Sequence, residues 1–292
     1  MTGADAVFLE HRSLLFTLAY EVVGTVVDAE DILHEAYLRW IDVDQSAVLN
    51  PRNYLAQIVV RQALNHLRSQ QRRREQYVGN WLPEPVSTGQ GVDIDVELAG
   101  SVSVAMMVVL ESLTPDERAV FVLHQVFGFA LTEIATFTMK SESAVRQIAR
   151  RSRAHVEARR RRFDPDPDRA DQVVARFLAS ARSGDLQSLM DVLAPDVVQM
   201  SDGGGKVVAA RRSITGAQAV AQFCIGVARK APSLRMEFIR FNAMPAMASW
   251  DGETAYQVLV FDIAGDRIQG IYAIRNPEKL TNVSRVFNLS RS

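Results

Sequence analysis

Arginine and glutamine side chains recur on one face of a helix that the sequence predicts directly after Ser141. By the helical period, the outward residues are Ser143, Arg146, Gln147 and Arg150, and the inward residues are Val145, Ile148, Ala149 and Ser152. Arg can donate two hydrogen bonds to guanine, and Gln can pair with adenine in the same way, when the helix lies in the DNA major groove. This face therefore predicts recognition of base edges.

The segment before this helix completes a helix-turn-helix pattern. Residues 131–137 (LTEIATF) form the first predicted helix, and Ser141 is a residue type that caps helix N-termini. Arg151 and Arg153 extend the basic face and suit phosphates, which position a protein without reading the sequence. The alternative is an ordinary helical hairpin with a solvated basic face.

A second polar stripe lies on a helix predicted from Asn50-Pro51, a cap followed by proline at the first helical position, to about Ser69. The inward ridge is Leu55, Val59, Ala63 and Leu67. The outward stripe is Gln57, Arg61, Asn65 and Arg68, and it is followed by Arg72, Arg73 and Arg74. Upstream, Asp28, Asp31 and Glu35 form an acidic stripe on a helix over DAEDILHEAYLRW. This stripe either compensates the helix dipole or docks a basic partner.

Charge and composition limit the class of protein. The 292 residues carry a net charge of −1, so phosphate contacts must come from local patches, here the run at 68–74 and a second at 150–162. The alternative for both runs is solvated helix ends. A single cysteine, Cys224, excludes an intrachain disulfide and suits a reducing compartment. No apolar run spans a bilayer and no signal-peptide pattern begins the chain, so we expect a cytoplasmic protein without a membrane partner.

Two proline-rich segments divide the chain. Residues 76–95 contain Trp81-Leu82-Pro83-Glu84-Pro85, which cannot form a regular helix. A large aromatic in a linker suggests packing on another element, although the neighbouring helix of its own domain is an alternative. Residues 96–113 and Pro115 to Phe127 are predicted as two helices, the second opened by a capping box at Thr114. Residues 163–168 form the second boundary.

After residue 168 the pattern changes to α+β. Helices are predicted over 170–183, 186–193 and 216–230, and strands over 234–241, 246–250, 254–263 and 267–275. We expect a hairpin of residues 197–201 and 206–210 around the Asp202 to Gly205 turn. A curved sheet wrapped on helices would form a cone with a mostly apolar pocket. The aromatic residues that could line it are Phe223, Phe238, Phe241, Trp250 and Tyr256, although core packing explains them equally well.

The N-terminal half resembles a bacterial sigma factor of the extracytoplasmic-function class. Residues 28–40 resemble the segment that docks on RNA polymerase, which assigns Asp28, Asp31 and Glu35 to that contact. Residues 51–69 resemble the helix that reads and melts the −10 promoter element. The −10 residues are then Arg61, Asn65 and Arg68. LTPDERAVFVL (113–123) and the helix-turn-helix resemble the module that reads the −35 element, with Ser143, Arg146, Gln147, Arg150, Arg151 and Arg153 as its DNA contacts.

The C-terminal half resembles a SnoaL-like domain, which a subgroup of these sigma factors carries. Three short motifs mark the subgroup: WLPEP, DGGGK and NPxKL. The residues that match are Trp81, Pro83, Glu84 and Pro85; Asp202, Gly203, Gly204, Gly205 and Lys206; and Asn276, Pro277 and Lys279. The resemblance implies regulation between domains by the fused domain, without a separate anti-sigma factor. We predict that the glycine turn packs near the linker, with Lys206 pairing with Glu84; a plain turn and a plain linker are the alternative.

The implied fold is multidomain: two all-α sigma domains, then an α+β SnoaL-like cone with a curved antiparallel or mixed sheet. The bounds are 1–78 for region 2, 79–95 for the linker, 96–163 for region 4 and 164–292 for the cone. Two positions depart from the family: Asn65 replaces a usual Asp, and Met139 stands in the helix-turn-helix where Gly is common. A positive φ there would strain Met139.

The implied function is promoter-specific transcription initiation with core RNA polymerase and promoter DNA as partners. Three alternatives remain open. A SnoaL-like isomerase or hydrolase would use carboxylates such as Asp202, Asp251 or Asp262, but no histidine follows His155 to act as general base. A small-molecule ligand in the cone is a further possibility. A one-component repressor would need no polymerase-docking helix. We predict no catalytic residue, cofactor or metal site.

Overall fold

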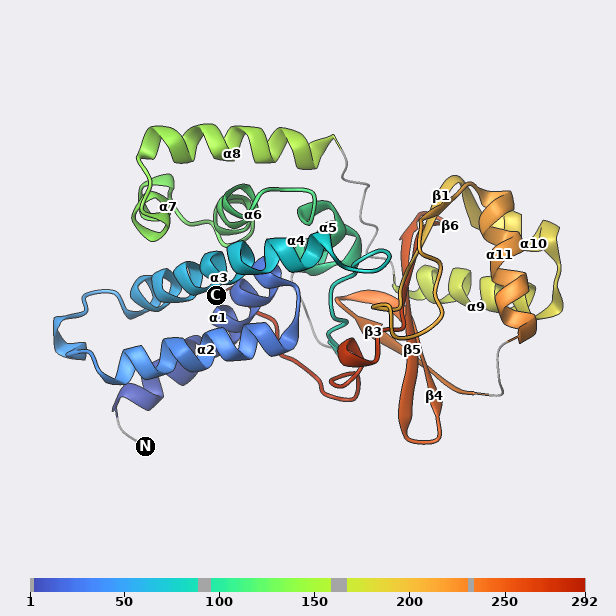
Figure 1. Cartoon of the computed structure of the whole chain (residues 1–292), viewed down its shortest axis with the longest axis horizontal. Coiled ribbons are helices and arrows are strands. Elements are labelled where there is room, and N and C mark those ends of the chain that lie inside the picture. The colour runs from blue at the N-terminus through green and yellow to red at the C-terminus, as the bar shows by residue number, and fades with distance from the viewer. Residues whose placement is uncertain (1–2, 89–95, 159–166, 231–233, 292) are drawn as a thin grey trace. The chain divides into compact units, whose positions relative to one another are not determined.

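The computed structural model describes residues 3–88, 96–158, 167–230 and 234–291 (Figure 1). The chain divides into two compact units. The first, the helical unit, contains Met1–Glu75, Met106–Arg160 and Asn288–Ser292, and the second, the cone unit, contains Gln76–Ala105 and Arg161–Phe287. The segment between the two predicted sigma modules is thus folded with the C-terminal half of the chain.

The helical unit begins with three long helices: α1 (Gly3–Val23), α2 (Val26–Ile41) and α3 (Pro51–Glu75), with a short 3-10 turn, η1 (Gln45–Ala47), before α3. Thr25 caps α2 by accepting from the Asp28 backbone N–H, and Asn50 accepts from the Asn53 N–H before α3. The predicted inward ridge of α3 is confirmed, because Leu55, Val59, Ala63 and Leu67 are buried.

The second half of the helical unit contains α6 (Pro115–Phe121), η2 (Val122–Val126), α7 (Leu131–Thr138) and α8 (Glu142–Glu157). Thr114 and Glu117 form the predicted capping box. The helix expected over Pro115 to Phe127 continues beyond Phe121 as one π-helical turn. The helix-turn-helix of α7 and α8 is present with Ser141 as the N-cap of α8.

The expected single helix over residues 96–113 is wrong. The structure has two, α4 (Val96–Val102) and α5 (Val104–Leu110), which meet at Ser103. The Ser101 and Ser103 hydroxyls donate to the carbonyls of Leu98 and Gly100, so they compete with the backbone for its acceptors. The Val102 carbonyl accepts from the Asn242 side chain at 2.9 Å instead of from a helical N–H.

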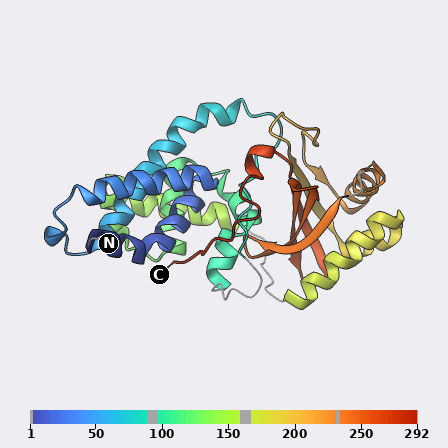
Figure 2. The ribbon, with the colours of Figure 1, turned by 90° about the horizontal axis from the view of Figure 1, so that it is seen from below.

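The cone unit is a six-stranded sheet covered by helices on one side (Figures 1 and 2). Its helices are α9 (Pro167–Ser183), α10 (Leu186–Val192) and α11 (Ala217–Lys230). Its strands are β1 (Leu193–Asp202), β2 (Ile214–Thr215), β3 (Arg235–Phe241), β4 (Met244–Asp251), β5 (Thr254–Ala264) and β6 (Arg267–Ile274). The order is β2-β1-β6-β5-β4-β3; β1 and β6 are parallel and the other pairs antiparallel.

The core of the cone unit lies between the helices and the sheet. The rings of Phe177 on α9 and Phe261 on β5 meet edge to face at 5.5 Å between centroids. Register shifts interrupt the pairing of β1 with β6, of β4 with β5 and of β5 with β6. Such irregularities bend strands and increase their twist, which curves the sheet around α9 and α11. The expected α+β cone is therefore present.

The hairpin expected around the glycine turn is wrong. Residues 206–210 form no strand, and the antiparallel neighbour of β1 is β2. The turn closes on itself, since the N–H groups of Lys206 and Val207 both donate to the Gly203 carbonyl. A 3-10 turn, η3 (Pro277–Lys279), follows β6. Within the described residues, no helix combines the length and the apolar character needed to cross a membrane.

Met139 ends α7 in the left-handed conformation, with φ 56° and ψ 40°, and its side chain is 75% exposed. We expect Met139→Gly to raise the free energy of unfolding by about 1 kcal/mol, because glycine removes the Cβ strain and little packing is lost. Urea unfolding of the full chain measures it. Gly128→Ala is the matched control: Gly128 has φ 69° and a Cβ there meets no described atom within 4 Å, so strain alone should destabilise. Equal signs for the two variants would contradict this account.

Candidate functional site

The outer face of α8 is exposed. Val145, Ile148 and Ser152 are buried, whereas Ser143, Arg146, Gln147 and Arg150 are exposed. Arg151 lies 3.8 Å from Glu117, and Arg153 donates to Glu157 one turn along the same helix at 2.7 Å. The basic residues Arg159 to Arg162 lie outside the described residues, as do the side chains of Arg72 to Arg74. The structure therefore presents the predicted reading residues of α8 together on one open face.

Two arginines of the outer stripe of α3 already bond other helices of the helical unit. Arg61 donates to the carbonyls of Phe137 and Thr136 at the end of α7, at 3.2 and 3.1 Å. Arg68 bonds Asp116 at 2.9 Å. These are neutral or exposed partners that an Arg exchanges readily. Asn65, the third predicted residue of this stripe, is exposed.

The acidic stripe of α2 separates into two parts. Asp28 is half-buried beside the N-cap Thr25 and lies 3.3 Å from His66 Nε2 on α3. Asp31 and Glu35 are exposed and border the same shallow hollow as Asn65 and His66. Helix capping thus accounts for the position of Asp28. Asp31 and Glu35 are exposed and could contact a partner protein.

The strongest polar cluster lies in the cone unit, where Asp202 at the end of β1 holds the linker. Its side chain is fully buried and pairs with Lys279 Nζ at 2.7 Å. It accepts hydrogen bonds from the Tyr77 hydroxyl and from the Leu82 backbone N–H, the latter at 2.9 Å. The Gly204 N–H donates to it as well, at 3.0 Å. A buried carboxylate needs this many partners, because burial of an uncompensated charge is costly.

Lys279 completes this contact from the other side. Its ammonium group donates to the Leu82 carbonyl and lies 4.0 Å from the centre of the Trp81 ring and 5.2 Å from that of Tyr77. We call Tyr77, Trp81, Leu82, Asp202 and Lys279 the linker-binding cluster. Burial, and then the hydrogen bond to Asp202, raise the pKa of the Tyr77 hydroxyl far above its usual range. The phenol therefore remains a donor to Asp202 at physiological pH.

The glycine turn allows the NPxKL segment to approach closely. A Cβ on Gly204 would lie 2.5 Å from the Asn276 side-chain nitrogen, and Gly204 has φ 60°. Asn276 in turn donates to the Tyr77 hydroxyl at 2.9 Å and caps η3 by accepting from the Glu278 N–H. The three motifs marked in the sequence therefore meet at one place in the cone unit.

The predicted ion pair of Lys206 and Glu84 is wrong. Lys206 pairs with Glu278, and Glu84 accepts from the Asn282 side chain at 2.9 Å. Glu84 is 1% exposed, so it lies inside the linker packing, whereas Lys206 is 46% exposed on the turn. Proximity of the two motifs was predictable, but the residues that join them were not.

The rest of the linker continues along the cone unit beyond WLPEP. Pro83 and Pro85 are buried. The Val86 N–H donates to the Asn242 side chain at 3.0 Å, and Val86 accepts from the Asn242 N–H at 2.8 Å. Asn242 and Tyr77 were not singled out in the sequence. The signal for Asn242 is weak, because an asparagine in a turn between two strands is common whether or not it binds another segment.

Comparison with known proteins identifies the family. The Sigma-70 region 2 family model matches residues 7–73, and the Sigma-70 region 4 model matches residues 103–156. The ECF RNA polymerase sigma factor SigJ of Mycobacterium tuberculosis is 37% identical over 286 residues, covering 92% of this chain and 91% of SigJ. The "Probable ECF RNA polymerase sigma factor SigI" of that organism is 33% identical over 207 residues, covering 70% and 71%. The crystal structure of SigJ matches with a TM-score of 0.76 at 33% identity, covering 95% of this chain and 98% of that one.

The chain belongs to the extracytoplasmic-function family of RNA polymerase sigma factors. It directs transcription initiation, with core RNA polymerase and promoter DNA as its partners. Members of this family are not enzymes, so the isomerase or hydrolase alternative is excluded. The fold is that of two helical sigma modules followed by an α+β domain with a mixed, curved sheet.

The Lys279–Asp202 pair predicts a large and specific stability effect. Lys279→Met leaves the Asp202 carboxylate buried without its cation, and we expect the unfolding free energy of the cone unit to fall by about 3–5 kcal/mol. Urea unfolding followed by circular dichroism measures it. Lys206→Met is the control, because the Lys206–Glu278 pair is 46% and 67% exposed and should contribute less than about 1 kcal/mol. Adding Asp202→Asn to Lys279→Met should restore part of the loss; similar effects of both lysine variants would refute a special role for Lys279.

Proposed function

We propose that the cone unit regulates this sigma factor by binding the linker between its two DNA-reading modules, without a separate anti-sigma factor. The single observation that carries the proposal is the buried Asp202–Lys279 pair, which bonds the linker at Leu82 from both sides. Contacts of this kind are strong only when complete, because partial loss leaves a buried charge. The linker is therefore either fully bound to the cone or released, and partly bound states are rare.

In this proposal, α8 contacts the −35 promoter element. Arg146, Gln147 and Arg150 would read base edges in the major groove, supported by their exposure on one face opposite buried Val145 and Ile148. Ser143 lies at the helix N-terminus, where a hydroxyl can reach a phosphate or base. Arg151 and Arg153 would contact phosphates.

The −10 contact is assigned to α3. Arg61, Asn65 and Arg68 would hold the melted strand, where captured single-stranded bases compensate the free energy of unpairing. The polymerase contact is assigned to α2, through exposed Asp31 and Glu35 with Asp28 beside them. Because polymerase and promoter lie in the cytoplasm, we also propose that compartment for the protein.

With α3 bonded to α7, the helical unit would not reach the −10 and −35 elements at the same time. Arg61 of α3 bonds the carbonyls of Thr136 and Phe137 in α7, so the two modules are in contact. The −10 and −35 elements are about 25 base pairs apart, or roughly 85 Å at the rise of duplex DNA. Extended, the twenty residues from Gln76 to Asp95 could span about 70 Å. Binding of residues 77–88 to the cone shortens the reach of this segment and favours the arrangement in which α3 and α7 are in contact.

Run-off transcription with purified core polymerase tests the regulation. The promoter would be selected from random sequence with the wild-type protein. We expect Asp202→Asn/Lys279→Met to raise transcript yield several-fold at equal polymerase occupancy, because the freed linker lets the modules separate. Lys206→Met, altered on the exposed side of the same turn, should leave the yield unchanged. An unchanged or lower yield for the double variant would refute this direction of control.

The −35 assignment is tested with duplexes that differ at single positions, bound by the holoenzyme at two salt concentrations. Arg146→Ala should weaken binding to the preferred duplex by about 1–3 kcal/mol and reduce the discrimination between bases at one position. Arg151→Ala should weaken binding to all sequences alike and reduce the salt slope by about 1. The assignment of base and phosphate contacts fails if Arg146→Ala lowers affinity uniformly.

A further inference from the structure

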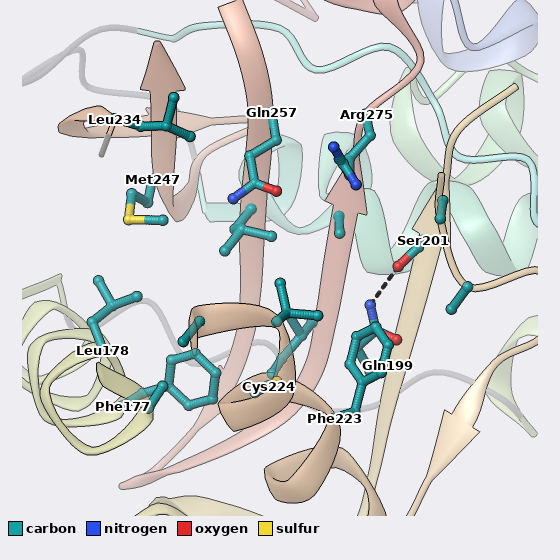
Figure 3. Close-up of a pocket in the computed structure, with 18 of the residues that line it drawn as sticks. Phe177, Leu178, Gln199, Ser201, Phe223, Cys224, Leu234, Met247, Gln257 and Arg275 are labelled. Carbon is teal, nitrogen blue, oxygen red and sulfur yellow. Dashed lines mark hydrogen bonds between the residues drawn. The ribbon is translucent and has the colours of Figure 1, made fainter. Parts of the chain in front are cut away.

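The cone unit contains a cavity of about 570 Å³ between its helices and the sheet (Figure 3). This volume is in the usual range for small-molecule sites. Most of its wall is apolar, with side chains such as Phe177, Leu178, Phe223 and Met247 around the body of the cavity (Figure 3). Of the aromatic residues predicted to line it, only Phe223 does so among the described lining residues. Phe241 and Trp250 are buried in packing instead.

Two residues that line the cavity each carry a buried polar atom with no hydrogen-bond partner among the described residues. One is Oε1 of Gln199, a side chain that is 2% exposed; its Nε2 donates to Ser201 Oγ at 2.6 Å (Figure 3). The other is Nε of Arg275. A buried acceptor and a buried donor left unpaired are each unfavourable. Gln199 and Arg275 both line the cavity, so a ligand that reaches these two atoms would supply the missing donor and acceptor.

The charge on the wall is positive. Arg182 and Arg275 line the cavity, and no Asp or Glu is among the described lining residues. The Arg275 guanidinium donates to two neutral groups, the Val208 carbonyl and, at 2.8 Å, the hydroxyl of Tyr256, whose ring centre lies 4.8 Å away. A half-buried guanidinium with neutral partners retains affinity for an anion, and its fork geometry suits a carboxylate.

We propose that this cavity binds an apolar hydroxy acid. Its carboxylate meets Arg275, its hydroxyl donates to Gln199 Oε1, and its hydrocarbon body fills the apolar part of the cavity. The single cysteine, Cys224, lines the apolar part, and burial raises the pKa of its thiol to about 12, so it offers the ligand a neutral surface. Within the described residues the acid's charge would find no competing carboxylate on the wall.

The polar end of the cavity is continuous with the linker-binding cluster. Ser201 precedes Asp202 in β1, and Arg275 precedes Asn276, which bonds Tyr77. The backbone N–H of Arg275 also donates to the backbone carbonyl of Asp202 at 2.7 Å. A ligand held by Arg275 therefore acts on the two segments that bind the linker. This regulatory consequence rests on the function proposed above, whereas ligand binding itself does not.

Calorimetric titration of the full chain tests the inference with three probes: 3-hydroxydecanoate, decanoate and decan-1-ol. We expect 3-hydroxydecanoate to bind, decanoate to bind about five-fold more weakly for the lost hydrogen bond, and decan-1-ol to bind more weakly still for the lost charge. Equal affinity for the acid and the alcohol would overturn the role of Arg275. No binding of any probe would overturn the site.

Variants separate the head-group contact from the apolar body. Arg275→Gln should remove the preference for acid over alcohol, whereas Arg229→Gln, an exposed arginine on α11 outside the cavity, should retain it. Cys224→Phe should weaken binding of all three probes by narrowing the apolar part of the cavity, and it decides the question if Arg275→Gln does not fold. Wild-type affinity in Cys224→Phe would place the probes elsewhere and overturn the proposal.

Run-off transcription keeps the two proposals apart. If 3-hydroxydecanoate binds and Asp202→Asn/Lys279→Met leaves transcription unchanged, the cavity is a ligand site and the proposed regulation fails. If that double variant changes transcription and no probe binds, regulation stands and the ligand proposal fails. A change of wild-type transcript yield by 3-hydroxydecanoate, absent in Arg275→Gln, supports both together.

Discussion

The cone unit depends on one buried ion pair, that of Asp202 with Lys279. Both side chains are buried, so each charge must be satisfied by protein groups, and the resulting cluster joins three distant parts of the chain. The Leu82 backbone is bonded through both its N–H and its carbonyl. An ion pair that would be a weak contribution on the surface thus becomes the condition for holding a proline-rich segment that has no regular structure of its own.

The glycine-rich turn is the geometric counterpart of that pair. Asp202 ends β1, the second strand of the sheet, and the chain must turn away without covering its carboxylate. Gly203 and Gly204 have no Cβ to collide with Val207 and Asn276, at 2.5 Å in each case. Lys206, the charged end of the same motif, stays at the surface with Glu278. Within this five-residue motif, then, Asp202 bonds the linker, Gly203 and Gly204 allow Val207 and Asn276 to approach closely, and Lys206 pairs with Glu278 at the surface.

Local patterns predicted most helices and strands, because their periodicity is a property of neighbouring residues. The faces of α3 and α8 and the strands β3 to β6 follow directly from it. The break at Ser103 depends on Asn242, whose side chain bonds the Val102 carbonyl 140 positions away, and the parallel partner of Leu193 in β1 is Ile268, 75 positions away; no local window contains either. The same limit explains the wrong Lys206–Glu84 pair: charge signs are visible in a sequence, but which charges are buried together is decided by packing.

The two predicted DNA-reading faces, both in the helical unit, differ in what they contact. In the helical unit the α8 face is open, whereas arginines of the α3 stripe bond α6 and α7. Those bonds are individually weak, since their partners are carbonyls or a partly exposed carboxylate. Under our proposal the stronger constraint lies in the cone unit, where the linker is bonded through buried charge. A weak contact between modules suffices to keep them together as long as the connecting segment is short, because a short tether keeps their effective concentration high. The residues that bind the linker then control promoter recognition, because they determine how much of the linker is free. The residues that contact DNA need not change their conformation.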